Sequence, residues 1–156
     1  MIEKIKNKII LEAVRDQYEN KIPFHRLLNL KMSKFDFQSA ELILPWNDQL
    51  IGNSVLGSLH GGVTATVLDS IGGLVAVGNF LAREKQKPAD YLKKRISKMG
   101  TIDLRVDYLL PGKGTKFTAT AKVIRGGKRV TVCRMEMHND DDNCIALGTG
   151  TYLWSK

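Results

Sequence analysis

The chain has 156 residues, of which 43% are apolar and 26% charged, and 24 Lys and Arg against 16 Asp and Glu give it a net charge of +8. This balance is typical of one soluble globular domain and excludes a disordered chain or a multidomain assembly. Asp69, Gly72 and Arg83 interrupt the longest apolar stretch, so no run reaches the roughly 18 to 20 apolar residues of a membrane span. We therefore expect no stable membrane insertion. The charged N-terminal residues leave no apolar signal core, which favours a cytoplasmic protein.

The first segment has the pattern of a surface helix. Ile2, Ile5, Ile9 and Ala13 recur at helical spacing among charged residues, which predicts an amphipathic helix over about residues 3–19. We expect this apolar stripe to pack on a sheet.

A long apolar helix follows two short strands. Two runs with β-type alternation precede Pro45, and the turn formers of residues 45–59 predict an irregular loop. Residues 63–81 are apolar on nearly every face, which predicts a buried helix. Residues 83–100 are polar and basic, and they form a connection with a short helix near its end.

The remainder of the chain is β-type. Four strands are predicted over residues 101–110, 116–125, 129–138 and 144–154, with a hairpin at Gly126-Gly127. We expect a single domain over residues 1–156, in which the N-terminal helix (1–20) precedes the core (22–156).

Two motifs resemble those of a known family. The run from Gly57 to Val63, which contains His60-Gly61-Gly62, is followed by Leu68-Asp69, and residues 100–112 read GTIDLRVDYLLPG. Together these motifs resemble the PaaI-like hotdog acyl-CoA thioesterases, in particular the YigI-type branch, over residues 22–154. The resemblance implies an α+β hotdog fold, an antiparallel sheet wrapped around a long helix. It also implies hydrolysis of medium- to long-chain acyl-CoA without a metal or redox cofactor, by a homodimer that pairs into a dimer of dimers.

Asp69 is the main chemical anomaly of the sequence. A carboxylate within an apolar helix is costly unless it is paired, hydrogen-bonded or used in chemistry. It either caps a loop or pairs with the backbone of a neighbouring chain, or it acts on a thioester carbonyl as general base or nucleophile. The resemblance favours the second interpretation, because Asp69 stands where the family has its catalytic carboxylate.

The start of the same helix is a candidate oxyanion site. The N–H groups of Gly61 and Gly62 lie in the first turn, where they lack intrahelical partners and the helix dipole favours negative charge. Alternatively, the glycines only permit close packing. In the family the N–H after the His binds the oxyanion, which corresponds to Gly61. His60 either caps the helix, which we favour, or orients the substrate carbonyl.

The spacing of these groups predicts a shared site. Gly61 and Asp69 are eight residues apart, which is about 12 Å along one helix with a rotation of roughly 80°. One carbonyl group cannot contact both. If both residues serve the same site, Asp69 must come from a second subunit, and the functional unit is at least a dimer.

Two further site residues follow from the resemblance alone. Thr101 stands where relatives have a Ser or Thr that positions the attacking water, although it also suits a plain strand. Asn53 resembles an Asn that holds the carboxylate and the water, but it lies one position further from His60 than in close relatives, so Ser54 is an alternative.

The basic residues are concentrated in the sequence. Residues 111–134 hold seven bases and no acid, and the hairpin bases Arg125, Lys128 and Arg129 flank glycine amides that suit the phosphates of coenzyme A. Solvated surface charge is the alternative. Only Phe117 is aromatic in this stretch, which argues against nucleic-acid binding.

Other functions fit the sequence less well. A non-catalytic acyl-CoA-binding protein of the same fold would not need Asp69, and hotdog hydratases use a different Asp/His motif. Cys133 and Cys144 form no CxxC, and the three histidines do not cluster with them, so we predict free thiols and no metal site.

Overall fold

A computed structural model describes residues 2–155. Its helical elements are α1 (Ile2–Asp16), the π-helical turn η1 (Gln17–Lys21), α2 (Pro23–Leu27), the 3-10 turn η2 (Asp48–Leu50), α3 (Gly61–Glu84) and α4 (Ala89–Ile96). Its strands are β1 (Lys31–Phe35), β2 (Ser39–Pro45), β3 (Ile51–Asn53), β4 (Ser58–Leu59), β5 (Met99–Tyr108), β6 (Lys116–Gly126), β7 (Val130–Asn139) and β8 (Cys144–Trp154).

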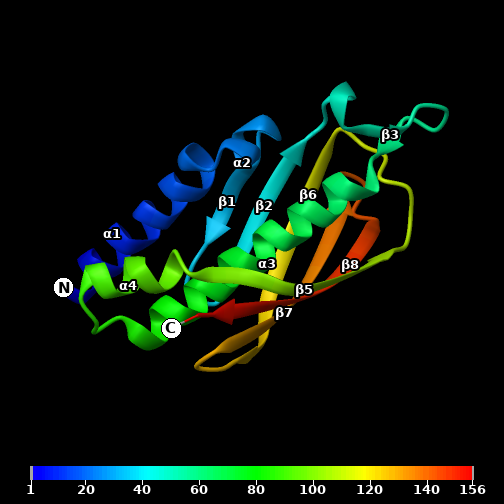
Figure 1. Cartoon of the computed structure of the whole chain (residues 1–156). Coiled ribbons are helices and arrows are strands. Elements are labelled where there is room, and N and C mark those ends of the chain that lie inside the picture. Colours follow the sequence, from blue (N-terminus) through cyan, green and yellow to red (C-terminus); the bar gives the residue numbers. More distant parts are fainter. Residues whose placement is uncertain (1, 156) are drawn as a thin grey trace.

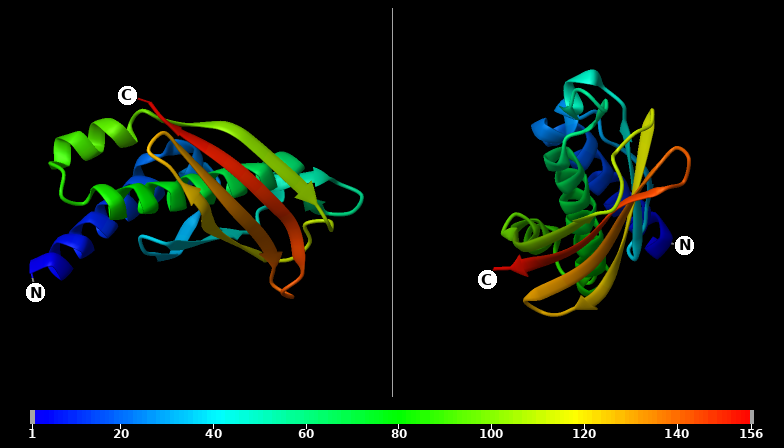
Figure 2. Two further views of the ribbon diagram at one scale, coloured as in Figure 1. Left: turned by 90° about the horizontal axis from the view of Figure 1, so that it is seen from below. Right: turned by 90° about the vertical axis from the view of Figure 1, so that its right-hand side faces the viewer.

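One antiparallel sheet wraps around α3. Six strands pair in the order β1-β2-β6-β7-β8-β5, and the short strands β3 and β4 form a separate hairpin. The sheet curves around α3, which crosses its concave face (Figures 1 and 2). This architecture confirms the predicted α+β hotdog arrangement of six main strands and one central helix.

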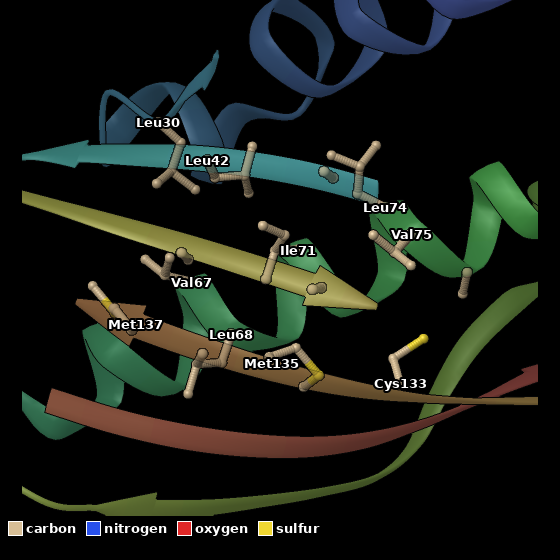
Figure 3. Packing of buried hydrophobic residues seen from close by; sticks show 14 of the residues in the cluster. Leu30, Leu42, Val67, Leu68, Ile71, Leu74, Val75, Cys133, Met135 and Met137 are labelled. Atoms are coloured by element: carbon tan, nitrogen blue, oxygen red, sulfur yellow. The ribbon is translucent and has the colours of Figure 1, made fainter. Parts of the chain in front are cut away.

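The core fills the space between α3 and the sheet. Val67, Leu68 and Ile71 of α3 are fully buried and face side chains of the central strands, including Met135 and Met137 (Figure 3). The most apolar 18-residue window of α3 has a mean hydropathy of 1.5, which would suffice for a membrane span by length and composition, but 67% of that window is buried inside the fold. We therefore interpret α3 as the core helix of the fold.

The far end of α3 is held by aromatic packing. The rings of Phe80 and Trp154 stack with their centroids 4.5 Å apart, and the Trp154 indole donates a hydrogen bond of 2.9 Å to the buried Thr131 hydroxyl. A satisfied indole N–H lets Trp154 be fully buried without an unpaired donor.

The predicted apolar stripe of the N-terminal helix is wrong. Ile5 and Ile9 are 56% and 61% exposed, and the core is contacted instead by Ile10, Val14 and Tyr18. The two sets lie on different faces of one helix, and helical periodicity fits both. Packing against the edge of the sheet decides between them.

Several short elements were not predicted. The segment 45–59 contains η2 and the β3–β4 hairpin instead of an irregular loop, because strands of two or three residues are too short to show a period. Pro23 ends the preceding helix, as expected, but it also starts α2 at a position where its missing N–H costs nothing.

The two edges of the sheet differ. At the β1 edge, the Arg15 guanidinium donates to the Met32 carbonyl, and Glu19 accepts a hydrogen bond of 2.6 Å from the Met32 N–H. Side chains thus occupy backbone groups that another strand would otherwise use. The β5 edge is ten residues long, pairs only with β8, and exposes 57% of Ile102.

The contact between Gly72 and Tyr152 gives a test of the packing. A Cβ on Gly72 would lie 2.0 Å from the hydroxyl oxygen of Tyr152, a side chain that is 1% exposed. We expect Gly72→Ala to lower the free energy of unfolding by about 2 kcal/mol, because overpacking costs up to about 3 kcal/mol and outweighs about 1 kcal/mol of helix propensity. Denaturant unfolding measures this loss. Gly100→Ala, where no atom lies within 4 Å of the new Cβ, is the control and should change stability little.

Candidate active site

The N-terminus of α3 is built on a capped turn. His60 has an extended backbone (φ −63°, ψ 133°), and its Nδ1 accepts a hydrogen bond of 2.9 Å from the Gly62 N–H. The His60 N–H donates to the Leu50 carbonyl at 2.8 Å, which ties the turn to the short hairpin beside it. His60 is therefore the helix cap that the sequence favoured.

The Gly61 amide remains available at this turn. Within residues 2–155 the Gly61 N–H forms no hydrogen bond, whereas the Gly61 carbonyl accepts one of 2.8 Å from the Tyr108 hydroxyl. The Tyr108 ring lies 3.4 Å from the position of a Cβ on Gly61, so this contact fixes the peptide next to the amide. An uncommitted N–H in the first turn of a helix suits a developing oxyanion.

Asp69 lies two turns further along α3 and is half-buried. Its Oδ1 accepts a hydrogen bond of 2.9 Å from the Thr101 hydroxyl, and its backbone carbonyl accepts one of 3.0 Å from Tyr152. The structure thus brings together Asp69 and Thr101, two of the predicted site residues. Burial raises the pKa of Tyr152 far above its usual range, and the Asp69 charge adds to this shift, so the phenol remains a donor.

Asp69 and Gly61 lie at two separate places on α3. Both belong to the continuous helix α3, eight residues apart, which corresponds to about 12 Å. Strand β5 contacts both residues. Thr101 near its start contacts Asp69, and Tyr108 at its end contacts Gly61.

A cleft of about 410 Å³ opens beside Gly61. Its walls are mainly apolar side chains from the loop before α3, the end of β5 and the start of β8: Leu56, Leu59, Tyr108, Leu109, Pro111 and Ile145. Half of the Leu109 side chain surface is exposed. The cleft therefore has room for an extended, partly apolar ligand that reaches the Gly61 amide.

Asn53 is the last residue of β3, and Ser54 begins the β3–β4 loop. The Asn53 side-chain oxygen accepts hydrogen bonds from the N–H groups of Val55 (3.1 Å) and Leu56 (3.0 Å). The Asn53 oxygen is therefore engaged in shaping the loop, and within this subunit its contacts are local. Ser54 is exposed at the same turn.

The basic hairpin lies at the opposite end of α3 from Gly61. Arg125, Lys128 and Arg129 are exposed, and the Arg83 guanidinium donates to both glycine carbonyls of the turn, at 3.3 Å (Gly126) and 2.9 Å (Gly127). The Gly127 N–H donates to the Val130 carbonyl at 2.8 Å. The expectation of an exposed amide at Gly127 is therefore wrong, because closing the hairpin uses that donor.

Metal ligands and reactive thiols are not evident in the described part of the chain. Residues 2–155 contain no group of three His, Cys, Asp or Glu side chains that could hold a metal ion. Cys133 and Cys144 are free thiols. Burial raises the pKa of Cys133 to about 12 and also raises that of Cys144, so neither is an activated nucleophile.

Three tyrosines of the site were not predicted from the sequence. Tyr108 contacts Gly61, Tyr152 contacts Asp69, and the Tyr18 hydroxyl lies near Gly73, one turn after Asp69. Only Tyr108 belongs to a motif that the sequence singled out. Their roles depend on which strands and helices meet, and no local pattern encodes that.

Known proteins with similar sequences and structures point to one family. A sequence model of the thioesterase superfamily matches residues 56–146. The chain is 43% identical over 143 residues to the medium/long-chain acyl-CoA thioesterase YigI of Salmonella typhimurium, and 42% identical to that of Escherichia coli, with 92% of each chain covered in both cases. A crystal structure from Shewanella oneidensis, described as related to the thioesterase superfamily, has a TM-score of 0.92 at 45% identity and covers 96% of this chain and 97% of that one.

Proposed function

The chain belongs to the thioesterase superfamily, and from that premise we propose that it is a soluble enzyme that hydrolyses acyl-CoA thioesters in the cytoplasm. The observation that carries the proposal is the hydrogen bond of 2.9 Å that holds the Asp69 carboxylate on Thr101. Similarity to the YigI proteins supports acyl-CoA as the substrate and medium to long acyl chains as the preferred range.

The chemistry needs a base and an oxyanion donor. Asp69 accepts a proton from water, the water oxygen attacks the thioester carbonyl carbon, and the Gly61 N–H donates to the oxyanion that forms. The intermediate then expels the coenzyme A thiolate, which takes up the proton held by Asp69. Alternatively, Asp69 itself attacks the carbonyl carbon, the C–S bond breaks, and the coenzyme A thiolate leaves behind an anhydride. Water then hydrolyses the anhydride to the fatty acid and the free Asp69 carboxylate, and the proton released by the acid protonates the thiolate. In both routes Thr101 holds the carboxylate in place, and Asn53 or Ser54 of the other half-site helps to hold the water.

We propose that the two half-sites meet across a dimer. The open edge of β5 supports this assembly, because an exposed edge strand is a template for pairing with another chain. Thr101 lies near the start of β5 and Tyr108 at its end. Antiparallel pairing about a two-fold axis near Leu104 and Arg105 therefore sets Asp69 of one subunit beside Gly61 of the other. Two such dimers then associate into the dimer of dimers.

We propose that the hairpin bases bind the phosphates of coenzyme A. Arg125, Lys128 and Arg129 are exposed next to a turn that Arg83 holds in shape. Along α3, Arg83 is fourteen residues from Asp69, or about 21 Å, so a ligand bound at both places must be long and extended. His60 and Gly62 complete the part of the site that binds the thioester group. There, His60 caps the turn that presents the Gly61 N–H.

The first prediction concerns Asp69. Asp69→Asn should lower kcat by at least about 100-fold, because positioned acid–base catalysis contributes 10²- to 10⁴-fold. Thiol release from acyl-CoA esters of increasing length measures this loss, with circular dichroism to check the fold. Thr101→Val should also reduce kcat, and Thr101→Ser, which keeps the hydroxyl, should retain most of the wild-type kcat.

Near wild-type turnover of Asp69→Asn would eliminate Asp69 as base or nucleophile. If the wild type binds acyl-CoA but releases no thiol, the protein is a non-catalytic acyl-CoA binder.

The second prediction tests the shared site. Gly61→Pro deletes the oxyanion N–H at a position where proline suits a helix, and the extended His60 backbone is compatible with a following proline. Mixing Gly61→Pro chains with Asp69→Asn chains should restore about one quarter of wild-type activity, because half of randomly formed dimers are mixed and each mixed dimer has one intact site of two.

Two controls accompany the mixing experiment. Gly61→Ala keeps the N–H and should remain active alone. Arg105→Cys in a Cys144→Ala background should be linked into dimers by a short bismaleimide, whereas Lys122→Cys on the central strand β6 should not. Verified mixed dimers that are as inactive as both parents would refute the shared site.

The third prediction concerns the hairpin. Replacing Arg125, Lys128 and Arg129 by Ala should raise KM for acyl-CoA with little change in kcat, because these groups are remote from the reacting carbonyl. A truncated acyl thioester without the nucleotide should be affected little, and added salt should mimic the defect. Equal losses on both substrates would instead assign the hairpin to the fold or to an interface. No loss on either substrate would move the nucleotide site elsewhere.

A further inference from the structure

A π-helical turn carries Tyr18 toward the Asp69 half-site. Such turns are rare and occur frequently at functional sites. η1 continues α1 directly, since Asp16 at the junction keeps a helical backbone (φ −58°, ψ −42°). Glu19 in the same turn accepts a hydrogen bond of 2.6 Å from the Met32 N–H, which fixes η1 on the edge of the sheet.

His25 locks the turn onto α3 beside Asp69. The His25 Nδ1 lies 3.0 Å from the Tyr18 carbonyl, and its Nε2 lies 3.0 Å from the hydroxyl of Ser70, the residue that follows Asp69. The His25 side chain is only 7% exposed, and its ring centroid lies 5.3 Å from that of Tyr18. Burial lowers the pKa of His25, which favours the neutral ring. Tyr18 is therefore held from its backbone and from one face of its ring.

The free end of Tyr18 points at α3 one turn after Asp69. A Cβ on Gly73 would lie 3.4 Å from the Tyr18 hydroxyl and 3.5 Å from the terminal methyl of Met99. Within residues 2–155 this hydroxyl forms no hydrogen bond, although its surroundings raise the pKa of Tyr18 through burial and through the Asp69 charge. The side chain is half-buried. Unlike Tyr152, it has no polar partner that requires it to stay where it is.

An acyl chain whose thioester group lies at Asp69 has few routes through the described structure. The α3 face toward the sheet is closed, because Leu68 and Ile71 there are fully buried in the core. The cleft beside Gly61 opens to solvent and includes half-exposed side chains in its walls. Gly73 has no side chain, and it is covered by the ring of Tyr18, the flexible chain of Met99 and the edge of the Tyr152 ring. The chain of Met99 can move aside without breaking a hydrogen bond, whereas the ring of Tyr18 is held beside His25 and bounds the route.

We propose that Tyr18 is a specificity-determining residue that ends the acyl-chain pocket, with the alkyl chain running from Asp69 over Gly73 to the Tyr18 ring. This inference rests on the proposed thioester hydrolysis. It assigns a substrate-selecting role to the N-terminal segment, which lies outside the matched region of residues 56–146. The chain length accepted by the enzyme is then set by the position of η1.

The experiment compares kcat/KM over acyl-CoA esters from four to eighteen carbons. Tyr18→Ala should leave the shortest substrates unchanged within about twofold. It should favour the longest ones by about fourfold for each methylene that becomes buried. Gly73→Ala should act in the opposite direction and lose the longest substrates first, because the added methyl group fills the route at ordinary contact distances. Tyr18→Phe should keep the wild-type profile, since the ring is what blocks the chain.

Controls separate this inference from the function on which it rests. Gln17→Ala, at an exposed position of the same turn, should retain the wild-type profile. If Tyr18→Ala does not fold by circular dichroism, Tyr18→Leu and Gly73→Ala carry the test. A wild type that hydrolyses no acyl-CoA refutes the proposed function. A wild type that hydrolyses acyl-CoA, while the Tyr18 and Gly73 variants keep its chain-length profile, refutes the role of Tyr18 alone.

Discussion

The rigidity of α3 is the constraint on which the rest of the structure depends. The buried helix α3 has 24 residues, and it carries the proposed oxyanion donor Gly61 and the carboxylate of Asp69 about 12 Å apart. No side-chain rotation closes that gap. The enclosing sheet holds α3 in place, so under the proposed mechanism a single carbonyl needs one of the two groups from another copy of the molecule. The proposed division of the site thus follows from the spacing of two residues on one helix.

Tyrosine hydroxyls connect α3 to the strands around it. Tyr108 binds the Gly61 carbonyl from the end of β5, and Tyr152 binds the Asp69 carbonyl from β8. Each holds a backbone carbonyl next to a proposed catalytic group and does not itself bind that group. Catalytic geometry of this kind needs supporting contacts as well as the groups that touch substrate. Here the supports come from strands far away in sequence, so a shift of the sheet relative to α3 would disturb both half-sites.

The sequence predicts the fold better than it predicts the site. Residues 63–81 are too apolar for anything but a buried helix, and four long alternating runs define the later strands, so the α+β arrangement follows from local patterns. The pairing of Asp69 with Thr101 follows only from resemblance, because 32 residues separate the two. The face of α1 that packs was predicted wrongly, since Ile5 and Ile10 satisfy helical periodicity equally. Tertiary contacts decide such cases, and a single sequence does not record them.

The β1 edge bears on how far the proposed assembly can proceed. Arg15 and Glu19 bind the Met32 backbone, so the Met32 N–H and carbonyl are not available to a further strand. Under the proposed pairing through β5, strand addition ends with a dimer, and the dimer of dimers has to form through other surfaces. The same six strands with two open borders could instead add copies in both directions.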